Sequence, residues 1–193
     1  MVQFASEPAP HTRQAKLIIL DRDGVINYDS DQFIKSPEEW RPIPGSLEAI
    51  ARLNHAGFRV VVATNQSGLG RGLFDTAAMI AVNEKLHKAL AHVGGRIDAV
   101  FYCPHPADSD CSCRKPKPGL LIEIGRRFGV ELTGVPCIGD SLRDLQAAQA
   151  VGAQPILVLS GKGEKTLREG SFPDNTVIFP DLAFAAAALL AGD

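Results

Sequence analysis

Two aspartates separated by one residue follow an apolar run, and their types and spacing could carry chemistry. The run Leu17–Leu20 is followed by Asp21, Arg22, Asp23 and Gly24. This pattern predicts a buried strand whose carboxyl end brings two acids into a crevice. Acids are costly to bury unless something beside them needs charge, and a divalent cation takes carboxylate oxygens. One acid could then bind metal and attack an electrophile while the other handles a proton. A solvated Asp-Gly turn is the alternative.

Two further apolar segments that predict strands also end in polar residues. The segment 58–63 is followed by the polar stretch 64–67, and the segment 135–138 is followed by Gly139 and Asp140. In an open α/β sheet, ligands bind outside the carboxyl ends of the strands, so these groups are expected to converge. Three carboxylates, a hydroxyl group and a later cation at 114–115 are the functional groups that phosphoryl transfer requires.

Three of the four cysteines lie close together with a histidine among them. The cluster consists of Cys103, His105, Cys111 and Cys113. Two ligand pairs joined by a short loop suit a closed tetrahedral Zn²⁺ site rather than a disulfide framework. Because no coordination position is left open, we expect a structural zinc that shapes the loop carrying the next two residues, Arg114 and Lys115.

The elements that must position these groups alternate between strands and helices. This order predicts an α/β fold with a mainly parallel sheet covered on both faces. We expect a helix that opens with Ser46 as its cap, a helix after Asp75, and an irregular loop over 160–175. The long stretch 27–44 could cover the site, or it could be a surface loop packed down by aromatic residues.

Length and composition set the remaining bounds. The 193 residues are 45% hydrophobic and carry a net charge of −2, which suits one globular domain over 16–193 preceded by a polar arm over 1–15. The slightly acidic balance gives no field that would attract nucleic acid or an anionic membrane. No secretory signal is expected at the start, and the longest apolar run, 182–191, is too short to span a bilayer.

Four motifs in order over about residues 16–160 resemble the haloacid dehalogenase superfamily of phosphatases. They are Asp21-x-Asp23-Gly, Thr64-Asn65, Lys115 and Gly139-Asp140-x-x-x-Asp144. The longer stretches 21–27, 64–68, 71–74 and 113–119 resemble the subgroup that removes the 7-phosphate from heptose 1,7-bisphosphate, for lipopolysaccharide or surface glycans. The resemblance implies a Rossmann-like doubly wound sheet without an inserted cap domain, and a cytoplasmic monomer that acts on a small sugar bisphosphate.

The same resemblance implies roles for individual residues. Asp21 would be the nucleophile, and Asp23 would be the general acid and then the base. Asp21, the carbonyl group of Asp23, and Asp140 would hold Mg²⁺. Thr64 and Lys115 would stabilise the phosphoryl group.

Substrate contacts are also implied, with Arg114 on the distal phosphate and Lys115 on the transferred one. The remaining substrate contacts would be Asp29, Gln32, Asn65, Gln66 and Ser67. Position 141 is Ser where the family often has lysine, so a charge near the phosphate is missing. Asp144 would support the site, with a solvated helix position as the alternative.

Other functions remain as alternatives, among them a phosphatase of another small sugar phosphate. A histidinol-phosphate phosphatase shares the aspartate motif and a similar zinc loop, so the catalytic core does not separate the two activities. A zinc-binding module without catalysis would leave the acids at the strand ends unexplained, and on nucleic acid it would normally be basic.

Overall fold

The computed structural model describes residues 16–192, so the expected arm over 1–15 lies outside the described residues. Six parallel strands form one sheet in the order β3-β2-β1-β4-β5-β6. The strands are β1 (Leu17–Leu20), β2 (Arg59–Asn65), β3 (Ala99–Cys103), β4 (Pro136–Gly139), β5 (Gln154–Val158) and β6 (Val177–Phe179). The expected α/β fold with a parallel sheet is confirmed.

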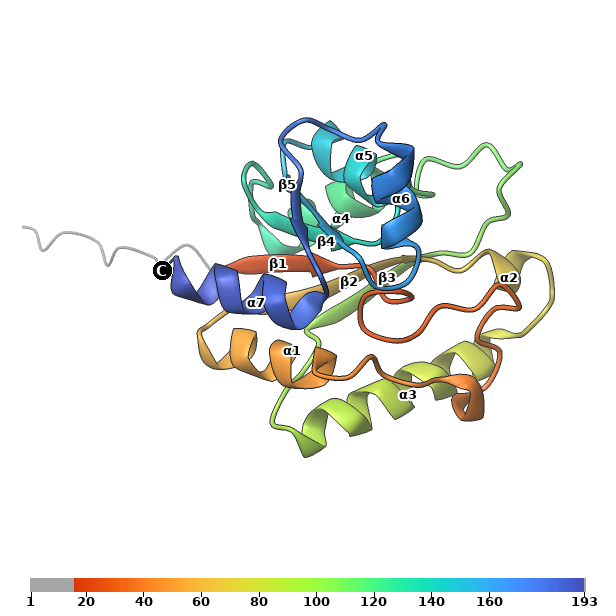
Figure 1. Cartoon of the computed structure of the whole chain (residues 1–193). Coiled ribbons are helices and arrows are strands. Elements are labelled where there is room, and N and C mark those ends of the chain that lie inside the picture. The colour runs from red at the N-terminus through yellow and green to blue at the C-terminus, as the bar shows by residue number, and fades with distance from the viewer. Residues whose placement is uncertain (1–15, 193) are drawn as a thin grey trace, which may run out of the picture.

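Helices cover both faces of this sheet (Figure 1). In that view α1, α3 and α7 lie below the sheet, and α4, α5 and α6 lie above it. The helices are α1 (Ser46–His55), α2 (Ser67–Gly70), α3 (Thr76–His92), α4 (Gly119–Phe128), α5 (Leu142–Ala150), α6 (Gly163–Glu169) and α7 (Leu182–Ala191), with a 3₁₀ turn η1 (Pro37–Glu39). The connections between these elements contain no inserted domain among residues 16–192.

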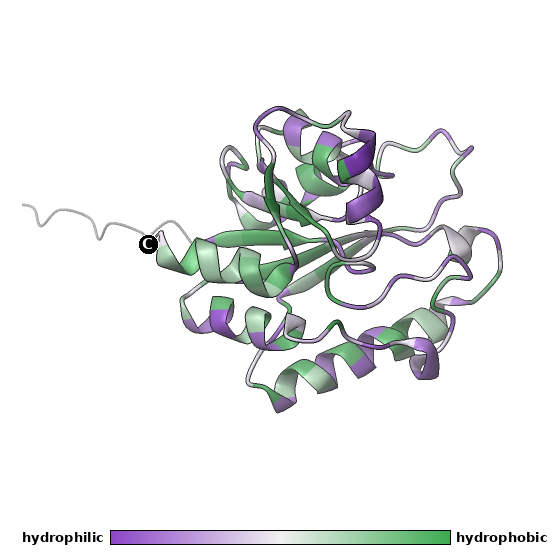
Figure 2. Ribbon diagram, in the orientation of Figure 1, coloured by the Kyte–Doolittle hydropathy of each residue, from purple (hydrophilic) through white to green (hydrophobic). Residues whose placement is uncertain are grey.

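Alternate residues of the strands face the two helical layers. Ile18 and Leu20 of β1 belong to the core shared with α1, α3 and α7, whereas Leu17 and Ile19 belong to the core shared with α4 and α5. Because successive side chains of a strand point to opposite faces, a strand that is apolar throughout has to be buried on both sides. Figure 2 shows this as green strands between helices whose green sides face them.

The strand order reverses between β1 and β4, and this reversal positions the chemistry. The chains that leave β1 and β4 turn to opposite faces, which opens a crevice at the carboxyl ends of the strands. Asp21 continues the pairing, because its main-chain N–H donates to the carbonyl oxygen of Ile138 at 2.8 Å. The acids that follow β1 and β4 are therefore held side by side.

The stretch 27–44 is both packed into the core and placed at the crevice. Trp40 is buried in the lower core, and Lys85 of α3 donates to the carbonyl oxygens of Pro37 and Trp40 at 2.6 and 3.1 Å. In Figure 1 the segment runs along the right-hand end of the sheet, where the strands finish. One part of this stretch is therefore a loop packed down by an aromatic residue, as the second alternative holds, and another part lies at the crevice, as the first holds.

Some local expectations were wrong. Ser46 is the first residue of α1 rather than its cap, because Gly45 occupies the cap position; the Ser46 hydroxyl donates to the carbonyl oxygen of Ile26 at 2.7 Å. The interval 160–175 contains the short helix α6, whose only large apolar residue is Leu167, so the sequence carries little periodic signal. Among residues 16–192, no helix combines the length and the hydrophobicity needed to cross a membrane.

The buried indole of Trp40 generates a stability prediction. Trp40→Ala should lower the free energy of unfolding by roughly 3–5 kcal/mol, since it leaves a large cavity under the loop. Tyr28→Ala is the matched control, because Tyr28 lies in the same loop and is 55% exposed. Urea unfolding of both variants measures the difference, and equal losses would show that Trp40 does not anchor the loop.

Candidate active site

Three buried carboxylates meet where β1 and β4 end. Asp21 follows β1, Asp140 follows β4, and Asp144 lies in the first turn of α5. One oxygen atom of each lies within 4.8 Å of the others. Asp144 is 3% exposed, so its interpretation as a solvated helix residue is wrong. Its carboxylate accepts hydrogen bonds from the main-chain N–H and the hydroxyl of Ser141, which close the start of α5.

A single lysine links two of these carboxylates. The Nζ atom of Lys115 lies 3.1 Å from Oδ1 of Asp21 and 2.5 Å from Oδ1 of Asp144, and it donates to the carbonyl oxygen of Ala63 at 2.7 Å. Burial acts to lower the pKa of Lys115, but Asp144 and Asp21 outweigh it and raise that pKa above its usual value. Lys115 is therefore a permanent cation beneath Asp21.

Negative charge nevertheless remains in excess. Burial raises the pKa of Asp21 to about 6 against the opposing effect of Lys115. Burial raises the pKa of Asp140 to about 8, and the charges of Asp144 and Asp21 add to this rise. Three buried carboxylates around one ammonium group form a site that a divalent cation would neutralise, and hard cations prefer such oxygen ligands. The residues present therefore fit a divalent metal ion.

Asp23 has a different environment from Asp21. Arg22 is buried and donates to both oxygens of Asp23, from Nε at 3.0 Å and from Nη2 at 2.9 Å. Asn27 and Gln66 each donate one further hydrogen bond to this carboxylate at 2.9 Å. Burial acts to raise the pKa of Asp23, but Arg22 and these donors outweigh it and lower the pKa. The ionised form of Asp23 is thus favoured in this arrangement.

The polar stretch after β2 connects the acids to the cationic loop. Gln66 Nε2 also donates to Oγ1 of the buried Thr64 at 3.0 Å, which leaves the Thr64 hydroxyl proton free to donate elsewhere. Asn65 exchanges two hydrogen bonds with the main chain of Lys115, at 3.1 and 3.2 Å. The end of β2 therefore fixes where Lys115 leaves its loop.

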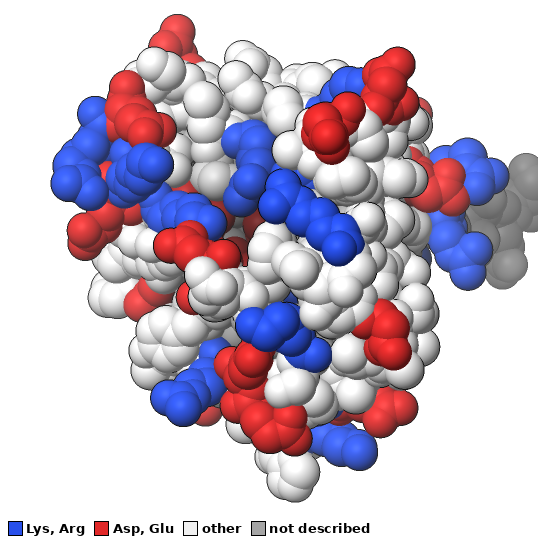
Figure 3. Space-filling view, turned by 90° about the vertical axis from the view of Figure 1, so that its right-hand side faces the viewer, with Lys and Arg blue, Asp and Glu red and all other residues white. Residues whose placement is uncertain are grey.

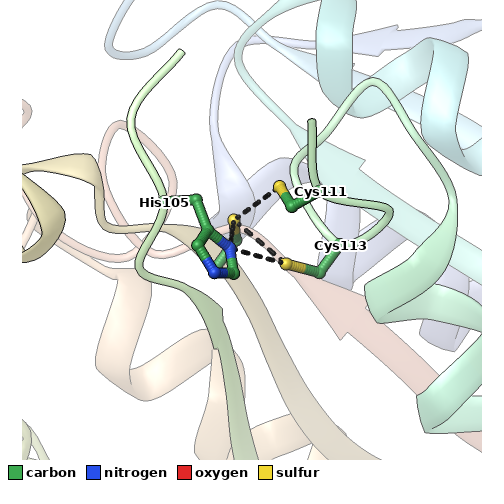
Figure 4. Close-up of side chains that lie close together, drawn as sticks. His105, Cys111 and Cys113 are labelled. Atoms are coloured by element: carbon green, nitrogen blue, oxygen red, sulfur yellow. Dashed lines mark hydrogen bonds between the residues drawn. The ribbon is translucent and has the colours of Figure 1, made fainter. Parts of the chain in front are cut away.

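The three cysteines and the histidine converge at the base of the same loop (Figure 4). Cys103 Sγ lies 3.7 Å from Cys111 Sγ, 3.2 Å from Cys113 Sγ and 3.5 Å from His105 Nδ1. These distances are too long for a disulfide bond of about 2.05 Å. A tetrahedron of ligands about 2.3 Å from zinc has edges of about 3.8 Å, so the four atoms fit a tetrahedral zinc site.

A polar cavity of about 220 Å³ opens above Asp21. Its wall includes Asp21, Asp23, Thr64, Asn65, Gln66, Ser67, Arg114 and Asp29 of the predicted residues. Lys115 lies beneath this wall rather than in it, since it is 3% exposed and contacts Asp21 from below. Gln32 is exposed and does not line the cavity, so we leave it out of the proposed site.

Figure 3 looks onto this end of the sheet. Blue side chains surround a recess near the middle of the face, and red atoms lie within and beside it.

Two cations that line the cavity were not predicted from the sequence. They are Arg143, in the first turn of α5, and Lys162, just before α6. Lys162 Nζ lies 2.8 Å from the carboxylate of Asp29 and 3.6 Å from that of Asp31, so it bridges to the loop after β1. Lys162 could have been predicted from its position after strand β5, because the carboxyl end of β5 lies at the same edge of the sheet as those of β1 and β4. Arg143 gave no such signal, since it lies inside a helix.

Two family models match the chain and agree with the class that the fold and the site define. The family described as HAD-hydrolase-like matches residues 112–185, and the family described as Polynucleotide kinase 3 phosphatase matches residues 16–136. The fold is a doubly wound parallel sheet with acids at the point where the strand order reverses. Together with the family matches, it makes this chain a phosphatase of the haloacid dehalogenase superfamily.

Relatives with high identity narrow this class. A D-glycero-beta-D-manno-heptose-1,7-bisphosphate 7-phosphatase from Bordetella bronchiseptica is 59% identical over 91% of this chain and 98% of its own. The enzyme of the same name from Pseudomonas aeruginosa is 55% identical over 90% of this chain and 97% of its own. A crystal structure of D,D-heptose 1,7-bisphosphate phosphatase from B. bronchiseptica, complexed with magnesium and phosphate, aligns with a TM-score of 0.91 at 58% identity, over 92% of this chain and 99% of that one. This chain belongs to the family of heptose-1,7-bisphosphate 7-phosphatases, which are phosphoric monoester hydrolases.

The close packing of Asp140 against Gly24 leads to a prediction for a side chain added at position 24. Gly24 has φ +86°, and a Cβ atom built on it would overlap the Asp140 carboxylate. Gly24→Ala should lower the free energy of unfolding by about 1–2 kcal/mol from the left-handed backbone and by about 1–3 kcal/mol more from the overlap.

Gly57→Ala is the matched control for this variant. Gly57 has φ +88°, and a Cβ atom there meets nothing within 4 Å. Urea unfolding of the two variants isolates the overlap, and losses of the same size would contradict a tight fit of Asp140 against the turn.

Proposed function

We propose that this chain removes the 7-phosphate from D-glycero-D-manno-heptose 1,7-bisphosphate, with preference for the β anomer. The observation that carries the proposal is the place of Asp21, at the base of a polar cavity with Lys115 behind it and Arg114 in the wall. The full-length relatives named for the β-anomeric bisphosphate support the substrate. The product would serve the synthesis of lipopolysaccharide or surface glycans, and we propose that the enzyme acts as a monomer in the cytoplasm.

The proposed reaction has two steps, in which the phosphoryl group is transferred first to Asp21 and then to water. In the first, the Asp21 carboxylate attacks phosphorus in line while Asp23 gives a proton to the leaving sugar oxygen. In the second, Asp23 takes a proton from water, and that water attacks the phosphorus of the aspartyl phosphate and releases inorganic phosphate. The donors that favour ionised Asp23 suit the base of the second step. To act as the acid of the first step, Asp23 must carry a proton, which it regains from water in the second step of each turnover.

Other residues stabilise charge during these steps. Lys115 lies against the attacking carboxylate, where it holds Asp21 in place and its positive charge would stabilise the phosphoryl group bound there. Thr64 has a free hydroxyl proton at the cavity wall and would donate it to a phosphoryl oxygen. Asn65, Gln66, Ser67 and Asp29 also line the cavity and would contact the sugar or its phosphates.

Two metal ions belong to this proposal. Mg²⁺ would be held by the carboxylates of Asp21 and Asp140 and by the main-chain carbonyl group of Asp23. When bound, it supplies positive charge that neutralises the transferred phosphate. The relative crystallised with magnesium and phosphate supports this choice of ion. A structural Zn²⁺ on the four clustered ligands would hold the loop from which Arg114 and Lys115 project.

Phosphate release from a small substrate panel tests the function. The panel contains both anomers of heptose 1,7-bisphosphate, histidinol phosphate and a hexose bisphosphate. We expect kcat/KM to be highest for the β-anomeric heptose bisphosphate. A preference for histidinol phosphate would replace the proposed substrate with the one remaining from the sequence analysis, and no release from any of them would contradict the proposed activity.

Asp21→Asn tests the nucleophile. An amide cannot attack phosphorus, so turnover should fall at least about 10³-fold while the fold is kept. Asp174→Asn, an exposed aspartate far along the chain from the motifs, is the control and should keep wild-type turnover. Stopped assays on both variants with matching circular dichroism spectra make the comparison. Normal turnover of Asp21→Asn would exclude the aspartyl-phosphate mechanism.

Metal analysis tests the zinc proposal. We expect about one Zn per chain from a Cys₃His site, and loss of that zinc together with reduced activity in Cys113→Ser. Cys137→Ser is the matched control, because Cys137 is a buried cysteine of β4 outside the cluster and its loss should leave the zinc content unchanged. A zinc-free wild-type protein with full activity would refute the site.

A further inference from the structure

Three cationic side chains line the cavity from one side of the sheet. Arg114 precedes α4, Arg143 lies in the first turn of α5, and Lys162 precedes α6. These three helices form the upper layer of Figure 1. The lining also includes Asp29 and Asp31 from the loop after β1, whose carboxylates lie 2.8 and 3.6 Å from Lys162 Nζ. Lys162 is thus paired with acids of the lining.

Two of the carboxylates that line the cavity each lie against a cation of the inner site. Asp21 is paired with Lys115, and Asp23 is paired with Arg22. Neither acid therefore needs an arginine from the wall. The charge that the wall arginines carry is left for another anion.

Within residues 16–192, neither wall arginine forms a close ion pair with an acid, although the charge of Arg143 contributes to the lowered pKa of Asp144. Arg114 donates from Nη1 to the carbonyl oxygen of His105 at 3.3 Å, and Arg143 donates from Nε to the hydroxyl oxygen of Ser141 at 3.2 Å. Both acceptors are neutral, and no carboxylate oxygen of the described chain lies within 4.0 Å of either guanidinium. Each guanidinium carries five N–H donors, so most of them are free for a ligand.

Arg143 has a second cation as its neighbour. The hydrogen bond with Asp29 raises the pKa of Lys162, while the charge of Arg143 acts against that rise. The two side chains also line a second hollow of about 550 Å³ beside α5 and α6, together with Asp31. They therefore stand at the outer edge of the cavity, between the site of phosphoryl transfer and the hollow beyond it. An anion placed there would relieve their mutual repulsion.

We propose that Arg143, with Lys162 beside it, binds the phosphate of the bisphosphate that is not transferred, and that Arg143 thereby selects bisphosphates over monophosphates. The proposal rests on the proposed function, because it takes a sugar bisphosphate as the substrate. A guanidinium matches a phosphate with two parallel N–H donors, and the Ser141 hydroxyl fixes the plane of Arg143 through Nε. The side chain at position 143 thus supplies the positive charge that serine at 141 lacks.

The kinetic signature of this role differs from that of a catalytic residue. A group that holds the distal phosphate contacts it equally in the ground state and the transition state, so its loss should raise KM more than it lowers kcat. A substrate without the distal phosphate should not sense the loss. A purely structural role for Arg143 would instead reduce turnover of both substrates alike.

The test compares heptose 1,7-bisphosphate with heptose 7-phosphate in the wild-type enzyme and in Arg143→Gln. We expect the variant to lose about 10- to 100-fold in kcat/KM on the bisphosphate, the effect of one charge-assisted hydrogen bond, mainly through KM. Its kcat/KM on the monophosphate should stay within about threefold of wild type, an effect under 1 kcal/mol. Arg143→Lys keeps the charge and should retain part of the preference. Arg168→Gln, on the exposed face of α6, should leave both values unchanged.

The outcomes separate this inference from the proposed function. A wild-type enzyme that does not prefer the bisphosphate would overturn both. A wild-type preference that survives in Arg143→Gln, or an equal loss on both substrates, would overturn the role of Arg143 and leave the function standing. If the preference disappears in Arg114→Ala but not in Arg143→Gln, Arg114 of the zinc loop binds the distal phosphate, and the role proposed for Arg143 is wrong.

Discussion

The buried ammonium group of Lys115 is the interaction on which the rest of the site depends. It joins Asp21, Asp144 and the carbonyl group of Ala63, which come from three different parts of the fold. An unpaired buried charge costs several kcal/mol, so the removal of one partner would leave the others in an unfavourable state. The position of Lys115 is thus fixed by the ends of β1 and β2 and by α5 together.

This constraint explains why the loop before α4 is held from two directions. Asn65 at the end of β2 binds the main chain of Lys115, and the cluster formed by Cys103, His105, Cys111 and Cys113 closes the loop on its other side. A bound zinc ion would remove the conformational freedom of a polar loop that has little apolar surface of its own. The proposed zinc site and the proposed nucleophile Asp21 are linked through the loop that carries Lys115.

The cavity has an inner part with closely held acids and an outer part with longer side chains. Arg22 donates to both oxygens of Asp23, and Asp140 packs closely against Gly24. The outer wall consists of longer side chains on loops and helix starts, among them Lys162, which reaches across to Asp29. Chemistry common to a large superfamily can stay in the inner part while the outer wall sets the substrate.

The sequence by itself determined the parallel α/β fold, the acids at the ends of β1 and β4, and the cluster of three cysteines and a histidine. Each rests on a local pattern, such as an apolar run that stops at an acid or cysteines at close spacing. Tertiary structure alone decided that Lys115 lies beneath the cavity, that Gln32 is not part of its lining, and that Arg143 and Lys162 are. Those facts depend on which side chains the strand order brings together. Contacts between segments that are distant in the sequence produce no local pattern from which they could be predicted.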